Sequence, residues 1–173
     1  MEIKVKNIKF SNEKSFVLIG GINVLENYES ALFAASHYKE VCSKLKINLV
    51  FKASYEKANR SSLKSYTGPG LKEGIKILAR IKEELNIPII TDVHLPDEAL
   101  FASEVCEIIQ LPAFLARQTS LIKSMAKTNA VINIKKPQFL SPNQIVYIVE
   151  KFRELGKEDL LICERGSLFG YDN

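Results

Sequence analysis

The sequence predicts an α/β fold of the barrel type, preceded by a short N-terminal β-hairpin. Short, almost entirely apolar segments alternate with amphipathic segments of helical length, which is typical of parallel strands covered by helices. Each apolar segment after the hairpin leads into polar or charged residues, and in a β/α barrel these strand ends open on the face that carries the chemistry. Residues 1–173 are therefore interpreted as a single barrel domain.

The first part of the chain predicts the hairpin, the first barrel strand and the first helix. Apolar and polar residues alternate over 3–10, and Asn12–Glu13 follows, which indicates short strands and a turn. The apolar run 16–19 indicates a buried strand ending on Gly20–Gly21, where the backbone can approach a ligand closely. Helical spacing over 29–45 predicts a helix with this apolar face: Ala31, Leu32, Ala35, Tyr38, Val41, Cys42 and Leu45.

The next two units repeat the pattern of strand and helix. The run Leu49–Lys52 predicts a strand, and 71–85 predicts an amphipathic helix. The run Pro88–Asp92 predicts another buried strand. Asp97 stands where its side chain can cap a short helix over 98–103.

Three further strands are predicted over 108–111, 131–134 and 160–163. Helical patterns over 119–127 and 141–155 connect them. The second of these helices begins with a serine and a proline, which suit the cap and first-turn positions, and a glycine directly follows its end.

Polar side chains at six strand ends are difficult to explain as chance. They are Asn23, Lys52, Asp92, Gln110, Lys135 and Arg165. A closed barrel needs eight βα units and this sequence supplies about six, so we interpret the fold as a TIM (β/α)8-type barrel without its last two units. A doubly wound open sheet remains the alternative, although residues 20–26 lack the glycine fingerprint of dinucleotide-binding folds.

Composition and charge exclude several classes of protein. The chain is 46% hydrophobic and 25% charged, as expected for an ordinary globular domain. Its net charge of +4 and the absence of a basic stripe interleaved with aromatic residues argue against nucleic-acid binding. No signal peptide or membrane-spanning run is predicted, and the widely separated cysteines indicate buried reduced thiols, so we expect a cytoplasmic protein without a membrane partner.

Candidate binding residues are concentrated in 52–62, directly after the second barrel strand. The stretch combines three cations with three hydroxyl groups: Lys52, Ser54, Lys57, Arg60, Ser61 and Ser62. Such groups form phosphate and carboxylate pockets. The alternative is a solvated basic loop on the surface.

The predicted barrel brings cations from separate strands together at its mouth, the end at which the strands have their carboxyl ends. These cations are Lys52, Lys57, Arg60, Lys135 and Arg165. Five like charges repel one another unless a polyanion binds, so we expect substrates with phosphate and carboxylate groups. Asp92 is a candidate counter-charge or acid–base group, and His94 is a candidate for proton transfer. Gln110 can donate a hydrogen bond to a carboxylate or a water molecule.

Seven motifs spread along the chain resemble the 3-deoxy-D-manno-octulosonate 8-phosphate synthase family, also called 2-dehydro-3-deoxyphosphooctonate aldolases. They are GGINVLE (20–26), FKASYEKANRSS (51–62), GPG (68–70), TDVH (91–94), QLPAFLARQT (110–119), KKPQF (135–139) and ERGSLFGYDN (164–173). The related heptulosonate phosphate synthases share the barrel but match these motifs far less. The resemblance implies a transferase of lipopolysaccharide biosynthesis that joins phosphoenolpyruvate to arabinose 5-phosphate.

The resemblance also implies binding roles. It places phosphoenolpyruvate against Lys52, Ser54, Lys57, Lys135 and Arg165. It places arabinose 5-phosphate against Asn59, Arg60 and Ser61. Arg117 would reach the sugar phosphate from a neighbouring subunit of a homotetramer, and Asp92 and Gln110 would line the same pocket.

Asn23 bears on metal dependence, because family members with cysteine at this position use a metal and those with asparagine do not. The resemblance therefore implies a metal-independent enzyme without a cofactor. In the implied reaction, C3 of phosphoenolpyruvate attacks the sugar aldehyde, water adds to C2, and the hemiketal phosphate expels inorganic phosphate. Lys135 and Arg165 are the candidate stabilisers of the developing charge.

Two alternatives remain open at this point. Family members continue for two more βα units that carry further site residues, so the chain could be an inactive fragment that binds a phosphorylated ligand or self-associates. The other alternative is a sugar-phosphate lyase or aldolase in which Lys52 or Lys135 forms a Schiff base.

Overall fold

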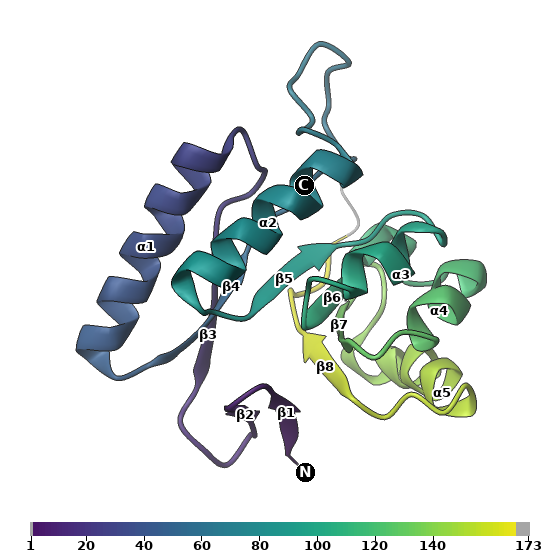
Figure 1. Ribbon diagram of the computed structural model, residues 1–173. Helices are drawn as coiled ribbons and strands as arrows, with labels where there is room; N and C mark the ends of the chain where they lie inside the picture. Colours follow the sequence, from purple (N-terminus) through teal and green to yellow (C-terminus); the bar gives the residue numbers. More distant parts are fainter. Residues whose placement is uncertain (1, 169–173) are drawn as a thin grey trace.

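The strands after the hairpin form one curled parallel sheet in the computed structural model, which describes residues 2–168 (Figure 1). Within these residues the sheet has six strands in the order β3-β4-β5-β6-β7-β8, which is their order in the chain. A doubly wound sheet reverses its strand order at a switch point. The sequential order therefore excludes that alternative and confirms the predicted partial barrel with a separate hairpin.

Most element bounds lie within one or two residues of the predicted ones. The strands are β1 (Ile3–Val5), β2 (Ile8–Phe10), β3 (Val17–Gly21), β4 (Asn48–Lys52), β5 (Ile89–Asp92), β6 (Ile108–Leu111), β7 (Val131–Lys135) and β8 (Leu160–Cys163). The α-helices are α1 (Tyr28–Leu45), α2 (Leu71–Leu85), α3 (Glu98–Ser103), α4 (Thr119–Ala126) and α5 (Val146–Glu154). Two short 3₁₀-helices are η1 (Ala113–Leu115) and η2 (Pro142–Ile145).

The hairpin closes the N-terminal end of the barrel interior. Strands β1 and β2 pair antiparallel, and their buried side chains form one cluster with residues of four sheet strands: Ile3, Val5, Ile8, Val50, Ile90, Ile108 and Val131. A charged contact supports this packing, because Glu107 lies 3.4 Å from the Lys6 ammonium and 2.7 Å from that of Lys82. The hairpin is thereby tied to both β6 and α2.

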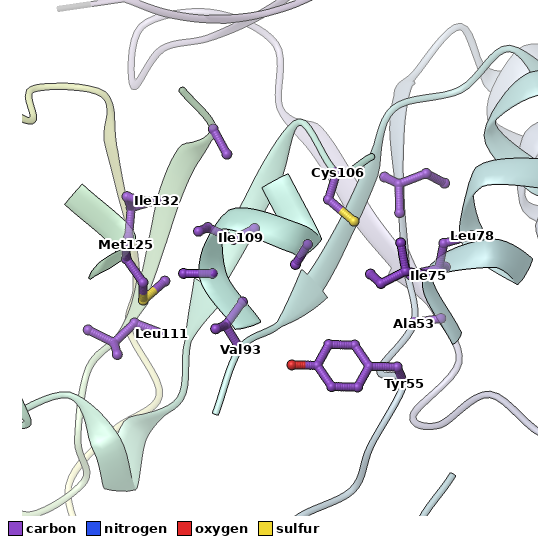
Figure 2. Close-up of a cluster of buried hydrophobic side chains, with 14 of the residues drawn as sticks. Ala53, Tyr55, Ile75, Leu78, Val93, Cys106, Ile109, Leu111, Met125 and Ile132 are labelled. Carbon is purple, nitrogen blue, oxygen red and sulfur yellow. The ribbon is translucent and has the colours of Figure 1, made fainter. Parts of the chain in front are cut away.

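The helices cover the outer face of the sheet (Figure 1). Figure 2 shows part of this outer layer, from Ile132 and Met125 at the left to Leu78 at the right. Helix α2 approaches the chain after β4 so closely that a Cβ atom on Gly74 would lie 2.3 Å from that of Tyr55. A glycine is therefore required at this crossing.

The predicted side-chain cap at Asp97 is wrong. The Asp97 backbone is already helical (φ −73°, ψ −16°), whereas a capping side chain usually comes from an extended residue. The Glu98 carboxylate instead holds the loop before the helix, since it accepts the backbone N–H groups of His94 and Leu95, each at 2.9 Å. The Tyr55 hydroxyl also donates to Glu98 at 2.7 Å.

Two predicted helices differ in detail. The apolar face expected on α1 is not fully buried toward the C-terminal end of the helix, where Val41 is 39% and Leu45 is 61% exposed. The helix expected over 141–155 starts as η2 and becomes α5. Its predicted start is confirmed, since Ser141 and Gln144 form a capping box with a proline in the first turn.

The cysteines are free thiols, as expected. Cys42 and Cys106 are buried, and burial raises the pKa of Cys106 to about 12. Cys163 is only half-buried at the end of β8, so the expected burial is wrong for this thiol, because β8 pairs with a strand on one side only within residues 2–168. Among the helices that the structure describes, none combines the length and the apolar composition needed to cross a membrane.

Candidate active site

The alternation of side chains along strands brings the predicted strand-end residues to the inner face of the sheet. The register aligns Asp92 of β5 with Gln110 of β6, and Gln110 with Asn133 of β7. Lys52 ends β4 and Lys135 ends β7. Because neighbouring strands lie about 4.8 Å apart, these side chains form a continuous polar row at the carboxyl end of the sheet.

Asp92 is the centre of a hydrogen-bond network within this row. The Ser54 hydroxyl donates to Asp92 Oδ2 at 2.7 Å, and Lys52 Nζ lies 3.4 Å from the same oxygen. Gln110 Nε2 donates to Asp92 Oδ1, and the Lys52 ammonium also contacts the Ser54 hydroxyl. Asp92 therefore connects three strands and holds Lys52 in place.

The charges of the network shift one another's pKa values. Burial by itself raises the pKa of Asp92, but the Lys52 charge and the hydrogen bond from Ser54 outweigh it, and the net pKa lies below its usual range. Burial lowers the pKa of Lys52, and the charge of Lys135 adds to this effect against the opposing influence of Asp92. An anion bound beside Lys52 and Lys135 would favour the charged ammonium.

Asn133 belongs to the network although it was not among the predicted site residues. It is buried, and its Nδ2 donates to Gln110 Oε1 at 2.9 Å. This bond fixes the Gln110 amide so that its nitrogen faces Asp92. The period-two pattern could have indicated Asn133, because it lies two residues before Lys135 on the same face of β7.

The basic loop between β4 and α2 projects above the carboxyl end of the sheet (Figure 1). Lys57 lies at its base, and its ammonium donates to Asn23 Oδ1 at 3.1 Å, which joins two predicted site residues. Asn59 and Ser61 are exposed. Arg60 is also exposed, and its Nε donates to the Tyr66 carbonyl at 3.1 Å within the same loop.

Lys135 and Arg165 occupy different parts of the mouth. Lys135 lines the inner cavity together with Lys52. Arg165 follows β8, is exposed, and donates from Nη1 to Gln138 Oε1 at 2.6 Å. Its guanidinium is therefore held at the rim beside the β7–α5 connection rather than against Asp92.

His94 and Arg117 lie at the edge of this arrangement. The His94 ring packs edge-on against Tyr55 with ring centroids 5.7 Å apart, and its buried Nδ1 has no hydrogen-bond partner within the described residues. His94 also helps to lower the pKa of Asp92. Arg117 is exposed in the turn between η1 and α4.

A cavity of about 900 Å³ extends along the inner face, from the hairpin to the polar row. This volume lies within the range of about 300–1,000 Å³ for small-molecule sites. Its upper lining is polar and includes Asn23, Lys52, Gln110, Asn133 and Lys135. Gly21 also lines it, but a side chain there would clash with the Lys52 carbonyl at 2.0 Å, so this glycine serves the close pairing of β3 with β4.

The donor set at the mouth consists mainly of ammonium, amide and hydroxyl groups. Across residues 2–168, no group of three or more histidine, cysteine, aspartate or glutamate side chains is close enough to hold a metal ion. The Asn23 side-chain oxygen in this set accepts a hydrogen bond from the Lys57 ammonium. These groups are suited to anions rather than to a cation.

Fold and site together define a partial β/α barrel with a cationic, anion-accepting mouth at the carboxyl ends of its strands. Comparison with known sequences gives a more specific result, since the model of the DAHP synthetase I family matches residues 1–173. The chain belongs to this family.

Curated relatives named 2-dehydro-3-deoxyphosphooctonate aldolase match 99% of the chain. The protein of Prochlorococcus marinus (strain MIT 9313) is 68% identical over 171 residues, which are 60% of its length. That of Parasynechococcus marenigrum (strain WH8102) is 63% identical over 172 residues, or 61% of its length. That of Pseudoalteromonas translucida (strain TAC 125) is 58% identical over 171 residues, or 60% of its length. The chain thus spans about 60% of the length of these relatives.

Proposed function

We propose that the protein condenses phosphoenolpyruvate with D-arabinose 5-phosphate and water to give 3-deoxy-D-manno-octulosonate 8-phosphate and inorganic phosphate. The observation that carries this proposal is the polar row in which Asp92 holds Lys52 next to Ser54, with Lys135 on the same inner face. The name of the relatives supports the same reaction. The proposal includes a cytoplasmic location and no partner among nucleic acids or membranes.

Phosphoenolpyruvate is assigned to the cations around the inner cavity. Lys52 and Lys135 would bind its negatively charged groups at the cavity wall, with Ser54 and Lys57 beside them and Arg165 at the rim. The pKa of Lys52 lies below its ordinary value, and a bound anion would stabilise its charged form. Both ends of a phosphate–carboxylate substrate would thus meet a cation.

Arabinose 5-phosphate is assigned to the loop after β4. Its phosphate would bind at Arg60 and Ser61, and Asn59 would contact the sugar. Exposure of this loop is compatible with a second subunit placing Arg117 near the same phosphate, so the proposal includes a homotetramer. The aldehyde end of the sugar would then point toward the inner cavity.

The chemistry requires charge stabilisation at two positions. When C3 of phosphoenolpyruvate attacks the aldehyde carbon, the carbonyl oxygen gains negative charge and is protonated. Water adds to C2, and the resulting hemiketal phosphate breaks its C–O bond to release phosphate. Lys135 and Arg165 would stabilise the charge on the departing phosphate. Asp92, held in place by Gln110, would orient Lys52, and Asp92 and His94 would move protons.

The proposed reaction needs no metal ion. The Asn23 oxygen is engaged by Lys57, and the charges at the mouth come from ammonium and guanidinium groups. This set can stabilise anionic groups directly.

Phosphate release tests the proposal. The purified chain is mixed with phosphoenolpyruvate and arabinose 5-phosphate, with and without a chelator, and a Lys52→Met variant serves as the control. Chelator-resistant release that needs both substrates and disappears in the variant is the expected result. Binding of phosphoenolpyruvate without release would instead indicate a ligand-binding chain without turnover. Trapping of a carbonyl substrate on Lys52 or Lys135 by borohydride would indicate Schiff-base chemistry.

A further inference from the structure

Lys136 is a fully buried charged residue that the proposed reaction does not use. It directly follows β7, and its side chain has 0% exposure. Strand alternation sends it away from the inner face that holds Lys135. A buried ammonium without hydrogen-bond partners would strongly destabilise the fold. The partners of Lys136 therefore indicate its role.

Backbone carbonyl groups account for all of the Lys136 donors. Its ammonium donates to the carbonyls of Pro137 at 3.0 Å, Leu140 at 2.7 Å and Gly166 at 2.9 Å. An ammonium has three N–H donors, so these bonds leave none for a ligand. Lys136 therefore connects the segment after β7 to the segment after β8.

Glu164 completes the connection from the other side. Its Oε1 lies 3.4 Å from the Lys136 ammonium and accepts the backbone N–H groups of Arg165 at 2.9 Å and Gly166 at 2.7 Å. The Leu168 N–H donates to the Gln138 carbonyl at 3.0 Å, which adds a second tie between the segments. The backbone on both sides of Arg165 is thus fixed to residues that follow β7.

We propose that Lys136 and Glu164 are positioning residues that orient Arg165 toward phosphoenolpyruvate. This inference rests on the proposed function for the identity of the ligand. A long arginine side chain binds a ligand more tightly when its backbone is fixed before the ligand arrives, because less conformational entropy is lost on binding. Lys136 acts through this backbone and does not touch the substrate.

The test combines a Lys136→Met variant with a control at the other end of β8. Lys157 is also a buried lysine, and it donates to the Thr128 carbonyl at 2.9 Å, so Lys157→Met removes a comparable charge far from Arg165. Amide hydrogen exchange measures how firmly Arg165 and Gly166 are held, and calorimetric titration measures the dissociation constant for phosphoenolpyruvate. A Glu164→Ala variant provides a second way to loosen the Arg165 backbone, because this side chain is 53% exposed and its loss is compatible with folding.

We expect Lys136→Met to accelerate exchange at Arg165 and Gly166 about 10-fold or more, and to raise the dissociation constant about 10-fold. Glu164→Ala should do the same, whereas Lys157→Met should change neither quantity. If Lys136→Met does not fold, Glu164→Ala decides the question. Unchanged exchange, or faster exchange with unchanged affinity, would overturn the inference. If the unmodified chain does not bind phosphoenolpyruvate, the proposed function fails, while the exchange measurement still decides whether the two residues fix the Arg165 backbone.

Discussion

Lys52, whose side chain is 18% exposed, and the fully buried Lys136 lie at the ends of different strands of the sheet, and they differ in their capacity to bind a ligand because their acceptors differ. The three donors of Lys136 are used by backbone carbonyl groups. Within the described residues, the Lys52 ammonium contacts only the Ser54 hydroxyl and the Asp92 carboxylate. One donor of Lys52 is therefore left for an anion, so that of these two lysines only Lys52 has a donor for a substrate. Burial of a lysine alone does not distinguish a binding residue from a structural one.

The pH dependence of phosphoenolpyruvate binding should change in an Asp92→Asn variant. The Asp92 charge raises the pKa of Lys52 against the effect of burial, so its removal lowers that pKa further. Binding requires the ammonium, so affinity is complete below the pKa of Lys52 and is lost as pH rises through it. The loss should begin at lower pH in the variant. Calorimetric titration over a pH series measures this shift.

The matched control for this pH series is Asp97→Asn, which removes an exposed carboxylate at the start of α3. Its affinity profile should superimpose on that of the unmodified protein. Equal midpoints for all three proteins would show that Asp92 does not support the charge of Lys52.

At the scale of single elements, a feature is predicted correctly from the sequence when it depends on residues close together in the chain, and less well when it depends on distant elements. The start at Ser141 was predicted correctly because a cap depends on residues within one turn. Asp97 has a suitable side chain, but its backbone conformation is set by the loop before it. The exposure of Val41 and Leu45 depends on which elements lie beside α1, and within the described residues α1 packs mainly on β3, β4 and α2.

Substitution of Gly74 tests the close crossing of α2 over the chain after β4. Alanine favours a helix by about 1 kcal/mol relative to glycine. The added Cβ would meet both Cβ and Cα of Tyr55, at 2.3 Å and 3.1 Å, and such overpacking costs about 1–3 kcal/mol. We expect Gly74→Ala to lower the free energy of unfolding by up to about 2 kcal/mol in urea denaturation. Exposed Lys76→Ala on the same helix should stay within about 0.5 kcal/mol. A gain in stability for Gly74→Ala would mean that the crossing is looser than the geometry indicates.

The N-terminal hairpin should contribute strongly to stability although it lies outside the sheet. Ile8 is 4% exposed and packs into the inner cluster. Truncation of a buried isoleucine to alanine typically costs about 2–5 kcal/mol through lost burial and the remaining cavity. We expect Ile8→Ala to lower the free energy of unfolding by such an amount in the same denaturation experiment. Lys4→Ala, on the exposed side of β1, should have little effect, and equal effects of the two substitutions would argue against an ordered hairpin.

For the whole molecule, the alternation of apolar strand segments with helical segments predicted most of the fold. It also predicted where the site lies, because the carboxyl ends of the strands of a parallel barrel meet on one face. Lys52, Asp92 and Gln110 were predicted to lie together, and they are linked by hydrogen bonds. Lys136 could not be identified in the same way. Its role depends on the Gly166 carbonyl, 30 residues away, and the sequence pattern contains no information on that contact.

The open edges of the sheet lead to a prediction about association. Within residues 2–168, β3 and β8 each pair with a strand on one side only, and Ile162 on β8 is 51% exposed. An unpaired apolar edge is a template for strand pairing between molecules. We therefore expect the chain to form species larger than the proposed tetramer as its concentration increases, and Ile162→Lys to reduce their amount severalfold in sedimentation velocity.

Val146→Lys introduces the same charge at a 40% exposed position on α5, away from the edge, and should leave the distribution unchanged. If Ile162→Lys and Val146→Lys sediment identically over the whole concentration range, the β8 edge does not mediate association.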